Sequence, residues 1–222
     1  MLRLTLVLIA LIALRPAHAQ DRCVVEEQSA TQLQALMTDG TCSARQLVIG
    51  YLDRITDLDD DLQAVLTLNP DALAHADQLD AERAAGQVRG PLHGIPVLLK
   101  DNVETSDRMP TTAGSLALEA NFAGADAPLV ARLREAGAII LGKTNLSEWA
   151  NFRSTNSSSG WSTLGGQTRN PYVLDRSPCG SSSGTGSAIA ASLAAIGVGT
   201  EMDGSITCPS SMNGLVGVKP TV

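Results

Sequence analysis

GSSSGTGSAIAASLAAIGVGTEMDGSITCP, Gly180 to Pro209, places two serine-rich turns at the ends of an apolar segment of small residues. The first turn contains Ser181 and the second contains Ser205, which are 205 − 181 = 24 residues apart. A serine hydroxyl is a weak nucleophile at neutral pH and needs a neighbouring base, most often a histidine. The last histidine of the chain is His93, so a base for these serines has to come from a distant part of the sequence.

The sequence around this stretch alternates between helical and strand patterns. Amphipathic periodicity predicts helices over residues 31–37, 43–55, 70–85 and 128–136, and a short helix beginning at 147–148. Apolar runs predict strands over residues 62–68, 94–102 and 138–142. A long functional loop is expected over the Ser-, Asn- and Gly-rich residues 151–186, followed by an apolar helix over 187–198. This alternation favours an α/β sandwich.

The composition points to a globular protein with a small-molecule partner. The chain has 222 residues, 44% of them hydrophobic, which is enough for one domain with a real core. Its net charge of −7 argues against nucleic-acid binding, which would require clustered Lys and Arg. No basic amphipathic stretch suggests attachment to anionic lipid.

The first residues have the pattern of a secretory signal. Arg3 precedes a short apolar run, and Ala17-His18-Ala19 forms an A-x-A cleavage site. The apolar run is too short to span a bilayer as a helix. We therefore expect residues 1–19 to be a cleaved signal peptide, a mature chain that begins near Gln20, export to the periplasm or the exterior, and no stable membrane insertion.

Four cysteines in an exported chain raise the question of disulfides. Cys23 and Cys42 could pair near the N-terminus. Cys179 and Cys208 each lie within three residues of one of the two serines, and small buried thiols are at least as good an interpretation for them. The spacings match no zinc pattern, and four cysteines allow three connectivities.

GAIILGKT, residues 137–144, matches the phosphate-loop pattern G-x-x-x-x-G-K-[ST]. A phosphate loop needs its four variable residues in a loop, with a strand before it and a helix beginning at the lysine. Here the four residues are Ala-Ile-Ile-Leu, which is a strand pattern, and a predicted helix comes before them. We interpret the match as a coincidence.

GSSSG, residues 180–184, matches the nucleophile elbow G-x-S-x-G with Ser182 at its centre. In an α/β-hydrolase that serine follows a buried strand, and its histidine lies downstream. The preceding SPCG is not a strand pattern, and no histidine follows within the sequence. A serine esterase using Ser182 remains an alternative that requires such a histidine.

A lysine offers a different base. Lys100 ends the apolar strand pattern GIPVLLKDN, and burial lowers the pKa of a lysine because it disfavours the ammonium form. Ser181 could then relay a proton between Lys100 and Ser205. Taken singly, the three residues are ordinary: a solvated cation at a strand end, a serine at a helix start, and a serine in a turn.

Together these stretches resemble the amidase signature family. The resemblance rests on SPCGSSSG, GTEMDGSITCP and GLVGVKPT near the C-terminus, and on PLHGIPVLLKDN and GAIILGKTNLSEWANF upstream. It covers essentially the whole mature chain and implies an α/β/α sandwich around a mixed sheet. Within the family, the sequence is most similar to bacterial peptide amidases.

The resemblance implies a site and a reaction. Ser205 would be the acylated nucleophile, Ser181 a bridging serine in a cis peptide, and Lys100 the base. The family spacing of 24 residues selects Ser181 over Ser182. The oxyanion would be held by the backbone N–H groups of Met202, Asp203, Gly204 and Ser205. A carboxamide, with peptide C-terminal amides as candidate substrates, would be hydrolysed to the acid and ammonia through an acyl-enzyme, without metal or organic cofactor.

Three departures from the family pattern matter. Thr207 stands where many members carry an arginine suited to a carboxylate. Glu201 and Asp203 replace the commoner Asp and Gly of GTDxGGS. The sequence ends at Val222, whereas family members are longer. We therefore expect residues 20–222 to be the N-terminal portion of one amidase domain, unstable or inactive by itself. An inactive fragment or a binding module is the non-enzymatic alternative.

Overall fold

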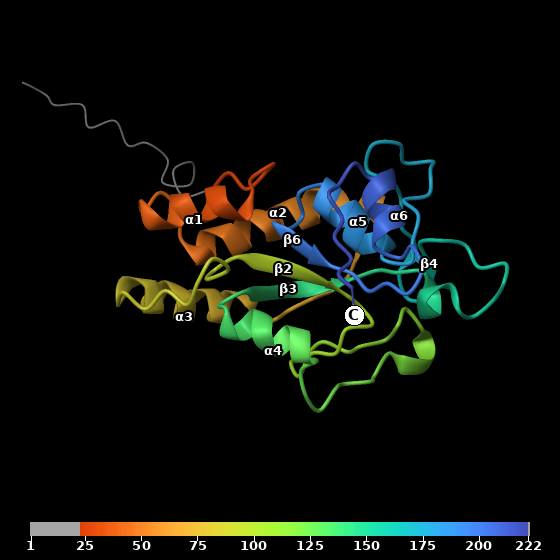
Figure 1. Ribbon diagram of the computed structural model, residues 1–222, viewed down its shortest axis with the longest axis horizontal. Coiled ribbons are helices and arrows are strands. Elements are labelled where there is room, and N and C mark those ends of the chain that lie inside the picture. The colour runs from red at the N-terminus through yellow and green to blue at the C-terminus, as the bar shows by residue number, and fades with distance from the viewer. Residues whose placement is uncertain (1–22, 222) are drawn as a thin grey trace, which may run out of the picture.

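A mixed four-stranded sheet forms the centre of the chain (Figure 1). The computed structural model describes residues 23–221, so the predicted signal peptide and its cleavage site lie outside the described residues. The strand order is β1–β3–β2–β6, with β1 antiparallel to β3 and the other pairs parallel. The strands are β1 (Val65–Leu68), β2 (Pro96–Lys100), β3 (Ile139–Thr144) and β6 (Ile196–Val198). A separate antiparallel hairpin consists of β4 (Trp161–Ser162) and β5 (Gly166–Gln167).

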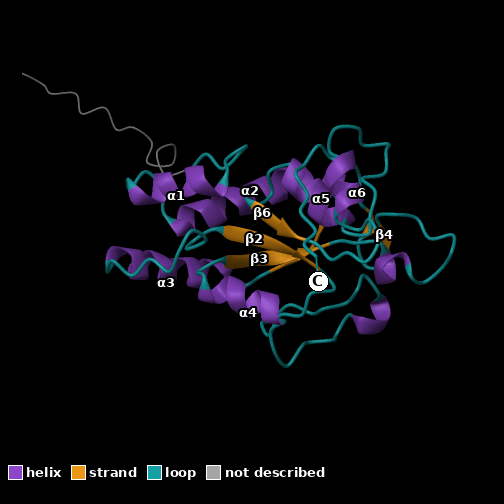
Figure 2. Cartoon of the chain, in the orientation of Figure 1, coloured by secondary structure: helices purple, strands orange, loops and turns teal. Residues whose placement is uncertain are grey.

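Helices cover both faces of the sheet, so the predicted α/β class is confirmed (Figures 1 and 2). The α-helices are α1 (Ala30–Thr38), α2 (Ala44–Leu62), α3 (Ala72–Ala84), α4 (Pro128–Glu135), α5 (Ser183–Ala190) and α6 (Thr207–Met212). Two 3-10 turns are η1 (Leu116–Leu118) and η2 (Glu148–Asn151). Helices α1, α2, α3 and α5 contribute to one core cluster, and α4 to the other.

The apolar runs of the sequence form the two central strands. Every residue of β2 and β3 is buried, as expected for parallel strands covered on both faces. The side chains alternate between the two core clusters: Leu98 packs with α2 and α5, whereas Val97 and Leu99 pack with Val130 of α4. This packing holds the C-terminal end of β2, and therefore Lys100, at a fixed place inside the protein.

Serines and glutamines start the first two helices. Ser29 and Gln32 form a capping box at α1, and Ser43 and Gln46 form one at α2, an arrangement that satisfies two backbone N–H groups at each helix start. Cys23 and Cys42 form a disulfide beside these helices, which confirms the pairing considered for them.

The predicted apolar helix over 187–198 is confirmed over 187–190 and is wrong over 196–198. Helix α5 begins four residues earlier and ends at Ala190, and residues 196–198 form the edge strand β6 beside β2. A run of Ala, Ile, Val and Gly has no polar periodicity to separate a buried helix from a buried strand. Ser192 interrupts the helix with a positive φ of 54°, and pairing with β2 fixes the strand.

Other boundaries differ by a few residues. The strand predicted over 62–68 begins at Val65 because α2 continues to Leu62 and ends with Gln63 in the left-handed region. The long loop contains the β4–β5 hairpin, and its last residues already belong to α5. Residues 139–142 of the phosphate-loop pattern lie in β3, so the pattern has strand geometry where a phosphate loop needs a loop.

The described chain leaves apolar groups uncovered beside β6. An apolar groove runs along α5 and β6, and Val216 and Val218 beyond α6 are 95% and 74% exposed. Exposed apolar surface of this kind promotes association, although the expected instability of residues 20–222 alone stays a prediction. Over residues 23–221, no helix combines the length and apolar character needed to cross a membrane.

Candidate active site

Lys100 is buried at the C-terminal end of β2. Its side chain is inaccessible to solvent, and burial lowers the pKa of its amine to about 7, with the charge of Glu201 acting in the opposite direction. The lowered pKa makes the neutral amine accessible near neutral pH, which is the condition for a lysine that accepts protons.

The structure brings Lys100, Ser181 and Ser205 into one line of contacts. Nζ of Lys100 lies 2.7 Å from Oγ of Ser181, which lies 3.0 Å from Oγ of Ser205. Ser181 is fully buried and follows a cis peptide bond after Gly180, whereas Ser205 is partly exposed. The line thus runs from the protein interior to a hydroxyl that a solute can reach.

A second acceptor orients the lysine. The carbonyl oxygen of Thr200 lies 3.2 Å from Nζ of Lys100. The hydroxyl of Thr200 is in turn held by the Asn102 side chain, whose Nδ2 donates to it at 3.0 Å. Our sequence interpretation did not single out Asn102 or Thr200, although both lie inside the motifs that carry the resemblance, KDN and GTEMDGS.

Ser182 links the two serine turns instead of standing in the open. Its backbone N–H donates to the carbonyl of Ser205 at 3.1 Å, and its hydroxyl lies 3.3 Å from both the N and the O of Thr200. The residue is 2% exposed. A nucleophile elbow needs an exposed serine with a histidine partner, and this geometry provides neither.

The turn from Met202 to Ser205 presents backbone N–H groups next to the serine pair. Gly204 has a φ of +75°, a conformation that glycine adopts without a steric penalty. Within residues 23–221, the amides of Met202, Asp203 and Ser205 form no hydrogen bond to protein atoms. The amide of Gly204 lies near the Glu201 carboxylate, which is next to the turn.

The Glu201 carboxylate holds the residues that directly follow this turn. Its Oε2 accepts hydrogen bonds from the backbone N–H groups of Ile206 at 2.6 Å and Thr207 at 2.8 Å. These bonds, with the one from Gly204, hold the pKa of the Glu201 carboxyl below its usual value. The negative charge also lies at the start of α6, where the free N–H groups of a helix favour an anion.

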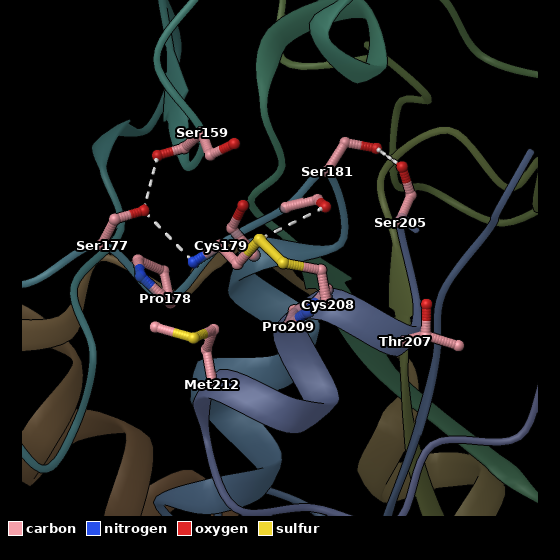
Figure 3. Close-up of a disulfide and its surroundings, with 12 residues drawn as sticks. Ser159, Ser177, Pro178, Cys179, Ser181, Ser205, Thr207, Cys208, Pro209 and Met212 are labelled. Carbon is pink, nitrogen blue, oxygen red and sulfur yellow. Dashed lines mark hydrogen bonds between the residues drawn. A yellow bond between two sulfur atoms is a disulfide. The ribbon is translucent and has the colours of Figure 1, made fainter. Parts of the chain in front are cut away.

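A disulfide joins the two serine turns (Figure 3). Cys179 and Cys208 are paired, with Cα atoms 5.9 Å apart. The interpretation of these residues as buried free thiols is therefore wrong. Sequence spacing could not decide the matter, because the pairing depends on how α5 and β6 bring the two turns together.

Neither histidine of the described chain reaches these serines. His93 is buried, and its Nε2 lies 2.9 Å from the carbonyl of Leu79. His75 is part of α3, within the helix predicted over residues 70–85. Lys143, the lysine of the phosphate-loop pattern, is also buried and donates to Val103 O at 2.8 Å and to Thr111 Oγ1 at 2.9 Å. These hydrogen bonds hold its amine inside the sheet.

Comparisons with known proteins agree with this architecture. Residues 46–222 match the model of the Amidase family. The structure superposes on native peptide amidase from Stenotrophomonas maltophilia with a TM-score of 0.87 and 57% identity, covering 89% of this chain and 41% of that one. It superposes on an amidase family protein from Bacillus anthracis with a TM-score of 0.81 and 42% identity, covering 84% of this chain and 37% of that one.

The chain is also similar to a curated amidotransferase subunit. A glutamyl-tRNA(Gln) amidotransferase subunit from Thermobifida fusca is 47% identical, over 87% of this chain and 38% of its own length. The chain spans 32–39% of the length of the first curated relatives that it matches. The family match covers most of the present sequence and includes every residue of the serine–lysine line. The chain therefore belongs to the Amidase family.

Proposed function

We propose that the full-length protein containing this chain hydrolyses carboxamides through acylation of Ser205. The observation that carries the proposal is the unbroken line of contacts from Lys100 Nζ through Ser181 Oγ to Ser205 Oγ, with distances of 2.7 and 3.0 Å. Both distances fall within the range over which a proton passes between heteroatoms. Membership of the Amidase family supports the same reaction class.

The first step moves two protons inward. In the neutral form of Lys100, the lone pair of Nζ accepts the proton of Ser181 while one N–H bonds the Thr200 carbonyl. Ser181 takes the proton of Ser205 at the same time, and Oγ of Ser205 forms a bond to the amide carbon. The carbonyl π electrons move to oxygen, and the ammonium of Lys100 stores the proton.

The second step returns a proton outward. The oxyanion is stabilised by the N–H groups that the 202–205 turn leaves free, a kind of contact worth about 3–4 kcal/mol per donor in transition states. As the C–N bond breaks, Lys100 passes its proton through Ser181 to the leaving nitrogen, and ammonia departs. Water then attacks the ester on Ser205 by the same route and releases the carboxylic acid, which restores the serine.

The sequence at the mouth of the site favours a substrate without a free acid beside the scissile amide. Thr207 is exposed where many family members carry an arginine, and its amide already bonds Glu201. A carboxylate placed here would meet the negative charge of Glu201, which bonds the Thr207 amide. Peptide amides, whose C-terminus is neutral, fit this arrangement, and the 57% identity to a peptide amidase supports them.

Two measurements on the full-length protein test this function. The first follows ammonia release from a peptide C-terminal amide and from the corresponding free acid, with release from the amide alone expected. The second maps the site labelled by a fluorophosphonate, with modification expected at Ser205. Modification at Ser182 would support the esterase alternative. A folded protein that neither labels nor releases ammonia would leave the binding-module alternative.

We also propose that the protein is exported. The signal pattern of residues 1–19 supports this, and so do the disulfides Cys23–Cys42 and Cys179–Cys208, since such bonds persist in oxidising compartments. Mass spectrometry of the protein from its native source should find a mature N-terminus at Gln20. An N-terminus at Met1 in the native protein would contradict export by this signal.

A further inference from the structure

We infer that the Cys179–Cys208 disulfide is a positioning element for the proposed reaction: it holds Ser181 and Ser205 at the separation that proton transfer requires. The inference rests on the function proposed above. Cys179 lies two residues before Ser181, and Cys208 lies three residues after Ser205. The two short segments 179–181 and 205–208 are therefore joined at one end by the disulfide and at the other by the Ser181–Ser205 hydrogen bond, which together close a small ring (Figure 3).

The other anchors of the turn that carries Ser205 are hydrogen bonds: Glu201 accepts from the amides of Ile206 and Thr207, and the amide of Cys208 donates to the carbonyl of Gly204 at 2.8 Å. Met202 is completely exposed and Asp203 is exposed. The carbonyl of Ser205 accepts one hydrogen bond, from the amide of Ser182 at 3.1 Å. Water can replace a hydrogen bond at a partly exposed position, whereas it cannot replace a covalent bond. Over residues 23–221, the disulfide is the sole covalent cross-link between side chains of the two serine turns.

Cys179 itself adopts a conformation that requires support. Its φ is +64°, in the left-handed region that a residue with a Cβ atom rarely occupies. The amide of Cys179 donates to the hydroxyl of Ser177 at 3.1 Å, and Ser177 is exposed. With the disulfide cut, we expect this segment to relax toward commoner backbone angles and to move Ser181, two residues on, away from Ser205.

The second disulfide provides a matched control. Cys23 and Cys42 are 8% and 7% exposed, near α1 and α2, whereas Cys179 and Cys208 are partly exposed. The two bridges join residues 19 and 29 positions apart, and the entropy of closing such loops changes only slowly with length. Their removal should therefore lower thermal stability by similar amounts, and only one removal should affect the serine pair.

The test compares Cys179→Ser/Cys208→Ser with Cys23→Ser/Cys42→Ser in the full-length protein, using the rate of fluorophosphonate labelling at Ser205. We expect the first variant to label roughly tenfold to a hundredfold more slowly than wild type, the loss that misplacement by about 1 Å brings. The pH at which labelling reaches half of its maximal rate should also rise. A loosened loop admits water to Lys100, and hydration raises the pKa of a buried lysine toward its usual value. The second variant should have the wild-type labelling rate and the wild-type pH of half-maximal labelling.

An unchanged rate and pH profile in the first variant would overturn the inference, and so would equal slowing of both variants.

If the first variant does not fold, selective reduction replaces it. Dithiothreitol gives two electrons and two protons to the partly exposed sulfur–sulfur bond, forming two thiols and a cyclic disulfide. Labelling should slow once alkylation mapping shows Cys179 and Cys208 reduced, and recover on reoxidation; an unchanged rate would overturn the inference. A wild-type protein that never labels at Ser205 would overturn the proposed function itself.

Discussion

Nζ of Lys100 lies 2.7 Å from Oγ of Ser181, although the two residues are 81 positions apart in the sequence. Strand β2 holds one partner and the turn before α5 holds the other. The contact is formed in the dry interior, where the ammonium form of a lysine is penalised and the neutral amine is favoured. This relationship makes the absence of a nearby histidine compatible with serine chemistry.

Replacement of Lys100 by methionine tests the role of the base. Lys100→Met keeps the length of the side chain and removes the amine, so we expect the rate of amide hydrolysis to fall about 10³-fold, within the range for loss of a general base. Folding should persist, because Nζ contacts the Ser181 hydroxyl and the Thr200 carbonyl, so its removal leaves no buried carboxylate unpaired. Steady-state kinetics and thermal unfolding measure the two effects. Turnover near the wild-type rate would contradict this role.

Lys143 is the matched control for that experiment. It is buried in the neighbouring strand, hydrogen-bonds Val103 and Thr111, and lies 3.8 Å from Asp101. Lys143→Met would leave the buried Asp101 carboxylate without its cation, so unfolding should become easier by about 3–5 kcal/mol. Any folded fraction should still label at Ser205. Loss of labelling with stability intact would instead place Lys143 in the reaction.

The pH dependence follows from the lowered pKa of Lys100, which is about 7 in the folded protein. The base must be neutral, so the labelling rate at Ser205 should rise between pH 6 and 8 and then level off. Relative to Lys100→Met, the free energy of unfolding should also rise with pH between about 7 and 10.5, because there the unfolded chain binds the proton that the folded chain has released. A rate independent of pH over 6–8 would exclude a base with this pKa.

Glu201 should affect both the turn and the base. Glu201→Gln keeps one acceptor oxygen but removes the charge that strengthens the hydrogen bonds from the amides of Ile206 and Thr207, so the 202–205 turn should loosen and the rate should fall roughly tenfold, less than on direct loss of an oxyanion donor. The negative charge raises the pKa of Lys100, so the pH midpoint should move to lower pH. Glu201→Asp keeps the charge and should keep the midpoint. Identical midpoints for the Gln variant and wild type would contradict the electrostatic effect.

Gly184 tests how closely α5 packs on the sheet. A Cβ atom at this position would collide with the carbonyl oxygen of Ala64 and lie 2.6 Å from the backbone N of Asn145. Backbone atoms cannot move aside cheaply, so Gly184→Ala should lower stability by about 1–3 kcal/mol or more, as overpacking does. Gly124→Ala, where nothing lies within 4 Å, is the control and should change little. Equal melting temperatures for the two variants would contradict the packing described.

Much of the fold could be predicted because local patterns and tertiary packing agree. The apolar run that ends at Lys100 forms a strand buried on both faces, and Pro128 stands at the first turn of α4 as expected. The failure over residues 196–198 occurs where composition is uniform: Ala, Ile and Gly suit a buried helix or a buried strand equally. There the position beside β2 decides the structure, and a neighbour is not visible in local sequence.

The site was predictable from motifs in part. The serines and the lysine were identified by the resemblance, whereas the contacts of Ser182 and Thr200, and the pairing of Cys179 with Cys208, depend on three-dimensional proximity. That the amides of Met202, Asp203, Gly204 and Ser205 bind an oxyanion stays a prediction.

Trapping the acyl-enzyme tests the central claim most directly. The full-length protein would be mixed with an ester or amide substrate, quenched in acid during turnover, and digested for peptide mass spectrometry. We predict that the acyl group is on Ser205 and that Lys100→Met accumulates none on the same timescale. An acyl group on Ser182, or amide hydrolysis in a Ser205→Ala variant at the wild-type rate, would contradict the account.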